Sequence, residues 1–477
     1  MIWQLLLVVT VLGVVYYRWT RRRLYQLAKK IPCLPDCYPV IGHAHIFAGG
    51  NEDIMQALQT IGRTANEQDG LTSFWVSNRL FVALTDPRAI EVVSKACLGK
   101  DEYLIKYIRT AIGNGSIFAP VNIWHPRRKI NAPFFSRKNL NQLVPVFDAK
   151  SSIMADLLQA EAGRGDFPIW RYITTFTFDT VCETAINTPI NTQKYPDHYY
   201  LLTAIDECTQ LLAKRVLQPW LHPDIIFERL PAYKRFQEHL QRAYRFLEEI
   251  IQNKKEKMSE RGIKNFKNNK DDISHFIDVI VQSSGGLEKG YSDLELREEL
   301  LVFMIAGSDT SATAVSFTTV LLSRYPEVQE KVYQELQEVF GDKFASGTTL
   351  VDSTTVMFNI WGTHRNAEYW GRDAEAFRPE RFLRPLPHAA MFVPFSHSVR
   401  NCIGATYAMM SAKTALANLL RRYRLLPPAG VRAADLQRPL HVKYDIMMKA
   451  VDNFTLRIEE RNRKSVTLNA VDNLIEK

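Results

Sequence analysis

The ten residues FSHSVRNCIG, at positions 395–404, carry the strongest signal in this chain. A helical pattern follows at once over residues 405–422, so Cys402 stands at the mouth of a helix with Arg400 two residues upstream. Backbone N–H groups and the positive end of the helix dipole favour a thiolate over a thiol at such a position. The loop therefore predicts a reactive or metal-ligating cysteine.

Three interpretations of Cys402 stay open when the loop is considered alone. A nucleophilic cysteine needs a histidine base, and His397 is the only histidine nearby in the sequence. A cysteine that ligates iron instead needs shielding from water and a basic residue for the carboxylates of a cofactor, without a base. A buried structural cysteine is the third interpretation, and it is the commonest one for a lone cysteine.

A second segment predicts a long helix through the core. The capping pattern SDLE at residues 292–295 predicts the helix start, and Pro326 predicts that the helix ends near Arg324. Between them, the run LVFMIAGSDTSATAVSF (residues 301–317) is apolar nearly all round, which is typical of a core helix.

Polar residues interrupt this apolar helix at its middle, as Gly307, Ser308, Asp309 and Thr310. An interior glycine costs about 1 kcal/mol relative to alanine, and a buried carboxylate costs several unless it is partnered. We expect the Thr310 hydroxyl to bond to the carbonyl of Ala306 and to bend the helix. The segment is either a functional site or a kinked core helix whose polar groups are satisfied internally.

A third pattern is WHPRRK at residues 124–129. Trp124 and Arg128 are four residues apart and share one face of a helix. An indole N–H beside a guanidinium forms a pair of donors suited to carboxylates. The pattern is weak alone, because a Trp and an Arg on a basic amphipathic helix are common.

The N-terminal run IWQLLLVVTVLGVVYY, at residues 2–17, is uncharged. As a helix it would be about 24 Å long, slightly short of the ~30 Å hydrocarbon core of a membrane. Four arginines follow the run within residues 18–23, whereas a cleaved signal peptide has its charge before the run and small residues after it. We expect a retained single-pass anchor over residues 1–20, with the rest of the chain cytoplasmic.

Residues 21–45 form a basic and Pro-rich linker in which prolines stiffen the chain. Cys33 and Cys37 have C-x-x-x-C spacing there, but no second ligand pair follows, so we expect no zinc site. Residues 46–477 predict one large, mainly α-helical domain with small β-sheets. Helical patterns cover residues 140–162, 233–257 and 294–322; strand-like runs cover 71–76, 80–84, 356–361 and 453–458; and the basic run 254–270 predicts a solvated loop.

Composition excludes several classes of protein. With 477 residues, 46% of them hydrophobic and 23% charged, the chain is globular rather than disordered or fibrous. Its net charge of +9 suits an anionic membrane face or an acidic protein partner, and is too diffuse for a nucleic-acid binder. Six sparse, unevenly spaced cysteines argue against a disulfide scaffold and for a reducing compartment.

Taken in order, these segments resemble the cytochrome P-450 superfamily of haem-thiolate monooxygenases, in its membrane-anchored eukaryotic form. The resemblance covers nearly the whole chain. Besides the anchor, the linker and the Trp124 helix, it includes AGSDT at residues 306–310, FRPERF at 377–382 and the cysteine loop. FDTVCETA at residues 178–185 and HRN at 364–366 look most like the fatty-acid-hydroxylase clan, particularly its arthropod branch.

The resemblance implies a role for each matching residue. Cys402 would be the axial thiolate of haem and so the metal ligand, and Arg400, Trp124 and Arg128 would hold the haem propionates. Thr310 would steady dioxygen, and Asp309 would help to deliver protons. The remaining residues that match the cofactor-binding motifs are Phe395, Ala306 and Gly307. Because Ala306 stands where many members of the clan have a haem-esterifying glutamate, no covalent link to haem is expected.

The resemblance also implies an activity and its setting. The chain would be a microsomal enzyme of the endoplasmic reticulum that inserts one atom of dioxygen into a fatty acid, lipid hormone or xenobiotic. Electrons would come from NADPH through a haemoprotein reductase, with a cytochrome b-type donor as a further partner beside membrane lipid and no nucleic acid. The reductase would dock on a basic face near Arg127, Lys129, Arg137 and Arg421.

Two departures from the family pattern bear on this activity. Ser398 replaces the first glycine of F-x-x-G-x-R-x-C-x-G, and a positive φ there would strain the serine by about 1–2 kcal/mol. The family's E-x-x-R helix and the strands after it are absent, so we expect an internal deletion between about 341 and 356 and an incomplete family fold. Without those partners we expect Arg381 to be unpaired in the core or turned out to water. The alternative function is therefore an impaired or inactive truncated member that binds haem or lipid weakly.

Overall fold

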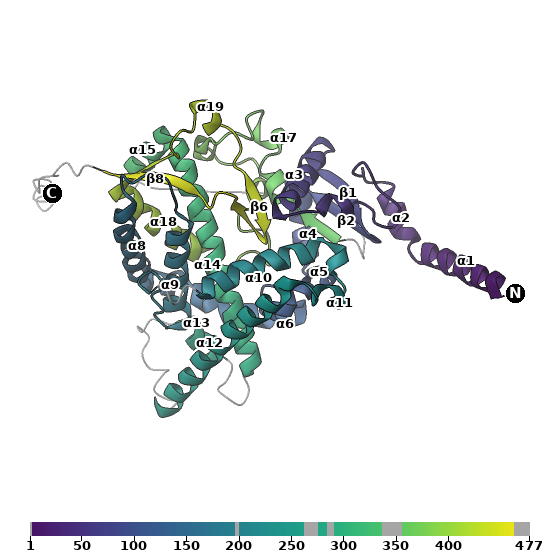
Figure 1. Cartoon of the computed structure of the whole chain (residues 1–477), viewed down its shortest axis with the longest axis horizontal. Coiled ribbons are helices and arrows are strands. Elements are labelled where there is room, and N and C mark those ends of the chain that lie inside the picture. The colour runs from purple at the N-terminus through teal and green to yellow at the C-terminus, as the bar shows by residue number, and fades with distance from the viewer. Residues whose placement is uncertain (1, 196–199, 262–274, 284–290, 336–354, 462–477) are drawn as a thin grey trace, which may run out of the picture.

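A computed structural model describes residues 2–195, 200–261, 275–283, 291–335 and 355–461 of the chain (Figure 1). Within these ranges the protein is mainly α-helical with small β-sheets, as the sequence predicts. The helices are α1 Ile2–Thr20, α2 Arg22–Ala28, α3 Asn51–Glu67, α4 Pro87–Ala96, α5 Glu102–Ile112, α6 Val121–Asn131, α7 Arg137–Gln142, α8 Val144–Leu158, α9 Trp170–Ile186, α10 Tyr200–Leu217, α11 Asp224–Phe227, α12 Pro231–Arg261, α13 Phe276–Ser283, α14 Asp293–Arg324, α15 Pro326–Glu335, α16 Ile360–Thr363, α17 Ala367–Trp370, α18 Ala405–Arg422 and α19 Ala433–Leu436.

The strands form two three-stranded sheets and one hairpin within the described residues. They are β1 Leu71–Val76, β2 Arg79–Leu84, β3 Phe167–Pro168, β4 Thr355–Phe358, β5 Tyr423–Leu426, β6 Val442–Asp445, β7 Met447–Ala450 and β8 Thr455–Glu460. The first sheet has the order β1-β2-β4, with β1 antiparallel and β4 parallel to β2, and Val82 opposite Val356. The second sheet has the order β3-β8-β5, and β6 pairs with β7 as the hairpin.

Helix α14 begins and ends where the sequence predicts. Ser292 Oγ accepts a hydrogen bond from the backbone N–H of Glu295, the Glu295 carboxylate accepts one from the N–H of Ser292, and the helix ends at Arg324 before Pro326. The first half of α14 packs in an apolar cluster with α9, α12 and α13, and its second half packs in another with α8, α9 and α18. The middle of α14, with residues 305–311, therefore lies at the junction of the two clusters.

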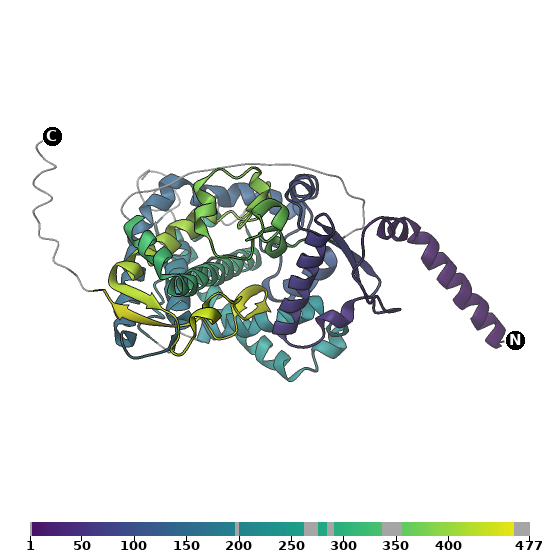
Figure 2. The same cartoon turned by 90° about the horizontal axis from the view of Figure 1, so that it is seen from above.

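The polypeptide around the N-terminus has two distinct parts. No residue of α1 is buried, and Figure 2 shows α1 projecting away from the body. Helix α2 instead packs Leu24 and Leu27 on the first sheet, and the segment after it pairs with β1 through the N–H of Leu34 and the carbonyl of Ser73, 2.9 Å apart. Two described helices are apolar and long enough to cross a membrane, but α14 is mostly buried, which leaves α1 as the candidate span.

Several predicted boundaries differ from the structure. The helix predicted over residues 140–162 is divided at Leu143, because Pro145 takes the first turn of α8 and lacks the N–H that a continuous helix needs. The loop predicted over residues 254–270 is helical as far as Arg261, where α12 ends; the rest lies outside the described residues. The strand predicted over 453–458 begins at Thr455, because Asn453 and Phe454 have positive φ. The predicted deletion between about 341 and 356 falls almost wholly outside the described residues.

Candidate functional site

The cysteine loop is held by its own backbone hydrogen bonds and leads directly into α18. The N–H of Cys402 donates to the carbonyl of Phe395 over 2.9 Å, and the N–H of Asn401 donates to the carbonyl of Ser398 over 3.0 Å. Ser398 has a φ of 64° and Ser396 a φ of 62°. Ser398 therefore has the positive φ under which the sequence predicts strain, and each serine holds a backbone conformation that favours glycine.

The Cys402 thiol is exposed at the surface of the loop. Surrounding protein raises the pKa of this thiol, while the backbone N–H of Gly404 and the Arg128 guanidinium act in the opposite direction. The backbone N–H at the helix terminus favours the thiolate as predicted, but desolvation outweighs it, and the net effect in the protein alone is a raised pKa. A bound metal cation would still deprotonate the thiol, because the positive charge of a coordinating cation stabilises the thiolate more than desolvation disfavours it.

His397 points to α4 and not to Cys402. Its ring Nδ1 lies 3.1 Å from Ser94 Oγ, and the charged groups that act on its pKa are Glu91 and Lys95, both on α4. This placement leaves Cys402 without the histidine base that a nucleophile requires. Iron ligation is the functional interpretation that remains for the exposed thiol.

Basic side chains gather beside the loop. The Arg400 guanidinium lies 4.3 Å from the centre of the Trp124 ring, and its Nη2 donates to the carbonyl of Ala119 over 3.2 Å. Its Nη1 is buried and has no hydrogen-bond partner among the described residues. Arg128 donates from both terminal nitrogens to Asn401, to the backbone oxygen over 3.0 Å and to the side-chain oxygen over 2.8 Å. Trp124 thus supports Arg400, and Arg128 supports the loop.

Lys100 is a further basic residue of this group that the sequence did not reveal. Surrounding protein and, to a smaller extent, the Arg400 guanidinium together lower the pKa of Lys100 to about 8. The unpaired buried nitrogen of Arg400, together with the exposed Lys100 whose pKa it lowers, fits a bound anion such as the carboxylates of haem. No local pattern marks Lys100, because it lies 300 positions before Arg400 and in an unrelated segment.

The middle of α14 is open to solvent on one side. Between residues 296 and 323, only Thr310 and Ala314 are exposed, and Ala306 is partly exposed on the same side. Thr310 Oγ1 donates to the carbonyl of Ala306 over 2.5 Å, which confirms the predicted hydrogen bond. Gly307 serves helix packing, because a Cβ there would lie 2.8 Å from Val181 Cγ2 of α9. An accessible face on an otherwise buried helix fits a flat cofactor bound against α14.

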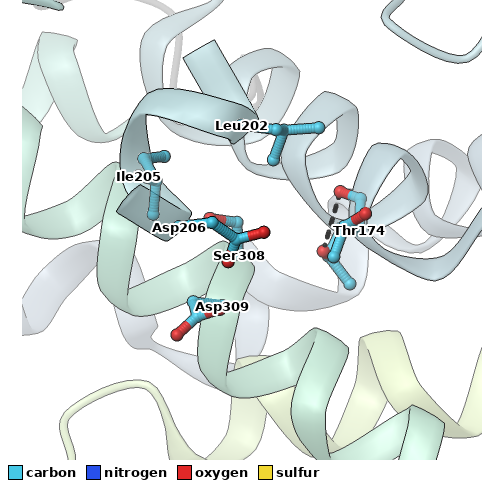
Figure 3. A pocket seen from close by; sticks show the side chains of 7 residues that line it. Thr174, Leu202, Ile205, Asp206, Ser308 and Asp309 are labelled. Atoms are coloured by element: carbon cyan, nitrogen blue, oxygen red, sulfur yellow. Dashed lines mark hydrogen bonds between the residues drawn. The ribbon is translucent and has the colours of Figure 1, made fainter. Parts of the chain in front are cut away.

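Asp309 faces a different environment from Thr310. Its Oδ1 lies 2.9 Å from Nζ of Lys449 on β7, and that ammonium also donates to Asp206 Oδ1 on α10 over 2.6 Å. Burial raises the pKa of Asp309, and Lys449 opposes this effect. Asp206, Ser308 and Asp309 line a small cavity (Figure 3). Its volume is about 10 Å³, the lower limit for one water molecule.

The family now follows from the sequence comparison. The cytochrome P450 family model matches residues 32–346 and 345–450. The chain belongs to the cytochrome P450 family. As a cytochrome P450 it is an oxidoreductase of the monooxygenase type, and haem is the cofactor that this family implies.

Its relatives are cytochromes P450 of arthropods and mammals, as the resemblance predicts. Cytochrome P450 4d2 of Drosophila melanogaster is 31% identical over an alignment covering 82% of this chain and 88% of that protein. Cytochrome P450 4c21 of Blattella germanica is 28% identical, with 96% and 98% covered, and cytochrome P450 4V2 of Homo sapiens is 24% identical, with 92% and 91% covered. The alignment with cytochrome P450 4c21 spans 507 positions, more than the 477 residues of this chain, so that relative carries residues that this chain lacks.

Two predictions about individual arginines of this cytochrome P450 are wrong. Arg381 is neither unpaired nor turned out to water: its guanidinium donates to the carbonyls of Trp370, Asp373 and Ala376 over 3.0–3.2 Å and lies 3.6 Å from the Asp373 carboxylate. Backbone carbonyls thus replace the acidic partner that the family motif would supply.

Arg127 is not part of an exposed basic face. It is buried, with Nη2 lying 2.9 Å from Glu295 and Nη1 lying 3.5 Å from Glu299, because its side of α6 faces the start of α14. Lys129, Arg137 and Arg421 are exposed as predicted. Arg127 is therefore not available to a protein that docks on this side.

Proposed function

We propose that this chain binds haem and inserts one atom of dioxygen into a hydrophobic substrate, reducing the other atom to water. The observation that carries the proposal is the unpaired, buried Nη1 of Arg400 beside Lys100, next to the Cys402 loop. Buried positive charge is costly unless an anion accompanies it, and the carboxylates of haem would be that anion. When bound, haem supplies the iron centre at which dioxygen is activated.

Each residue around the loop takes one part in this proposal. Cys402 ligates the iron through its sulfur, which requires the thiol to give up its proton. Arg400 and Lys100 bind the carboxylates, while Trp124 keeps the Arg400 guanidinium in place through the ring contact. Arg128 holds the loop at Asn401. The carbonyl of Phe395 fixes the backbone of the ligand, Ala306 keeps the accessible face of α14 free of a large side chain, and Gly307 lets α14 pack closely against α9 beside that face.

Proton handling falls to the middle of α14. The Thr310 hydroxyl is the polar group on the accessible face, and it holds a proton at Oγ1 that it now donates to Ala306. Asp309 lies behind it, and burial raises the pKa of its carboxyl, so this group can bind a proton closer to neutral pH than an ordinary aspartate. We assign Asp309 the uptake of protons and Thr310 their placement near the reacting oxygen.

The substrate class rests on the helices that pack over α14. The buried faces of α5 and α10 are mostly apolar, with Ile105, Leu201 and Ile205 among them. A fatty acid, lipid hormone or xenobiotic fits such surroundings better than a polar metabolite does. Difference spectra recorded with fractionated lipid extracts would identify the class, and the absence of any spectral response to apolar compounds would contradict it.

The setting of the enzyme rests on α1 and on apolar residues of the body. We place α1 in the membrane of the endoplasmic reticulum, residues 21–45 as the linker, and residues 46–477 on the cytoplasmic side. Val40, Trp220 and Ile225 are exposed, and Figure 1 shows α11, which carries Ile225, at the same end of the body as α1. Electrons then come from NADPH through a haemoprotein reductase or from a cytochrome b-type donor, docking near Lys129, Arg137 and Arg421.

The decisive experiment compares cysteine variants of the full chain. Cys402→Ala should abolish the Soret band that a thiolate-ligated, reduced, carbon-monoxide-bound haem gives, whereas Cys97→Ala and Cys182→Ala should retain it. Cys182 is the matched control, since its buried thiol has a pKa raised well above the usual range and it remains a thiol. A thiolate spectrum that survives in Cys402→Ala would overturn the assignment. Alignments that run through nearly the full length of the relatives speak for an enzyme rather than for an impaired, truncated member.

A further inference from the structure

Two histidines that flank the cysteine loop both reach α4. His397 Nδ1 lies 3.1 Å from Ser94 Oγ, and His388 Nε2 lies 3.7 Å from the Glu91 carboxylate, one turn earlier on the same helix. Ser94 and Glu91 are both buried, at 5% and 1% exposure. The segment from His388 to His397 is thus attached to α4 at both ends, and it leads directly into the residue that would ligate the iron.

Ser94 lies between two hydrogen-bond partners. Its hydroxyl oxygen is 3.0 Å from the carbonyl of Glu91 and 3.1 Å from His397 Nδ1. The hydroxyl has one hydrogen, which it can donate either to the Glu91 carbonyl, while accepting from a His397 ring protonated at Nδ1, or to a His397 ring unprotonated at Nδ1. In both arrangements, loss of the Ser94 oxygen would leave the half-buried His397 Nδ1 without this partner, and the ring would turn away from α4.

The backbone on either side of His397 is strained and must be held by contacts with other elements. Ser396 and Ser398 both have positive φ, at 62° and 64°, and each would relax toward an ordinary conformation if the loop were free. His397 lies between them and carries the side-chain contact to α4. A strained backbone conformation persists only where contacts with its surroundings hold it. The contact between His397 and Ser94 lies at the centre of the strained stretch.

We propose that Ser94 is a positioning residue for the haem ligand, acting through His397 to hold the strained loop in the conformation that presents Cys402. The proposal rests on the proposed function, because it assigns the means by which the candidate ligand is held. Glu91 supports the same segment from its other end through His388. The exposed Lys95 pairs with the buried Glu91, and Arg88 is the remaining charged residue of α4.

The test combines loss of the contact with relief of the strain. Ser94→Ala should lower the ratio of thiolate-ligated to otherwise ligated haem by about fivefold, the effect of losing one hydrogen bond of ordinary strength. In the Ser398→Gly background the same change should have less than about a twofold effect, because glycine adopts positive φ without strain. Ser323→Ala is the matched control, since Ser323 is equally buried and bonds locally to Val320, but has no bond to the loop. It should leave the ratio unchanged.

A second readout needs no haem. In the apoprotein, Ser94→Ala should speed the alkylation of Cys402 by iodoacetamide by about fivefold relative to exposed Cys37, and Ser398→Gly should suppress this increase. The proposal would be overturned if Ser94→Ala changed the alkylation rate and the haem ratio no more than Ser323→Ala does. It would also be overturned if Ser94→Ala had the same effect in the Ser398→Gly background as in the native chain. If no variant gives a thiolate spectrum, the proposed haem function fails, and the alkylation rates still decide the role of Ser94.

Discussion

Lys449 Nζ lies 2.9 Å from Asp309 Oδ1 in a buried ion pair, and Asp309 immediately precedes the exposed Thr310 on α14. The same ammonium also contacts Asp206, so two carboxylates from α14 and α10 share one cation from β7. Burial alone would lower the pKa of Lys449, but Asp309 and Asp206 together raise it. The pair therefore joins the three elements at the point where α14 opens to solvent, and it holds the Asp309 carboxylate away from the accessible face.

Replacing this lysine should destabilise the protein in a pH-dependent way. Lys449→Met leaves the buried Asp309 carboxylate without its cation, which costs about 3–5 kcal/mol at neutral pH. Burial already raises the pKa of Asp309, and loss of the lysine raises it further. A carboxyl whose pKa is raised by folding does not oppose folding while it is protonated in both states, but it opposes folding once the pH is high enough to ionise it in the unfolded chain. The free-energy penalty of Lys449→Met should therefore be larger at about pH 8 than at about pH 5.

Thermal unfolding at the two pH values measures this penalty. Lys331→Met is the control, because Lys331 pairs with Glu380 at the surface, and its replacement should change the midpoint much less at either pH. An Lys449→Met penalty that is the same at both pH values would contradict the argument.

Thr310→Ala should separate consumption of NADPH from formation of product. Loss of the only exposed hydroxyl on the accessible face of α14 should reduce product by about tenfold or more while NADPH oxidation continues and peroxide is released. Thr318→Ala is a close control, since Thr318 makes the same bond to the carbonyl four residues earlier, two turns further along α14. Equal losses of product and NADPH oxidation in Thr310→Ala would argue against this role.

Arg127 and Lys129 should behave oppositely despite lying two residues apart. Arg127→Ala leaves the buried Glu299 carboxylate short of its cation and should cost about 3–5 kcal/mol of unfolding free energy. Lys129→Ala should leave stability nearly unchanged and should raise the KM for the reductase at low salt, with the difference fading as salt screens the charge. Unfolding curves and reductase titrations at two ionic strengths would check both, and a salt-independent KM would contradict a docking role for Lys129.

Removing residues 1–23 should weaken membrane association without abolishing it. The truncated protein loses α1 but keeps the exposed apolar residues Val40, Trp220 and Ile225. Vesicle flotation should show reduced binding, and further replacement of Val40 and Ile225 by serine should remove most of the remainder. In intact microsomes, an external protease should cleave the chain beyond residue 30; protection of that region would show that the cytoplasmic assignment is wrong.

Restoring the missing segment should improve haem retention. The family match is divided at residues 345–346, and we propose that a helix with the E-x-x-R motif and the following strands are absent from there. Inserting the family's E-x-x-R helix and the strands after it between Gly341 and Val356 should raise haem content and hydroxylation. The gain in stability should be modest, because Arg381 already bonds to backbone carbonyls. Equal, high haem content in both chains would show that this fold does not need the network.

The sequence by itself determined the elements whose signals are local. The capping pattern at Ser292, the proline after Arg324 and the apolar run between them define α14, and the run after the cysteine loop defines α18. The bond from Thr310 to Ala306 was predictable for the same reason. Each depends on residues within one or two turns of the backbone, where hydrogen-bonding geometry and steric limits act directly.

Only the tertiary structure decided which charged groups act on one another. Lys100 and Arg400, Lys449 and Asp309, and Arg127 and Glu299 are far apart in the chain and carry no common pattern. Arg381 could not be predicted to bond to carbonyls, because a lost ionic partner can be replaced by any acceptor that folding brings within reach. Helix periodicity predicts which face of a helix is apolar, but the partner of a buried charge depends on how separate elements pack. Because burial removes water from the charged group, that partner then decides the pKa of the group and its effect on stability.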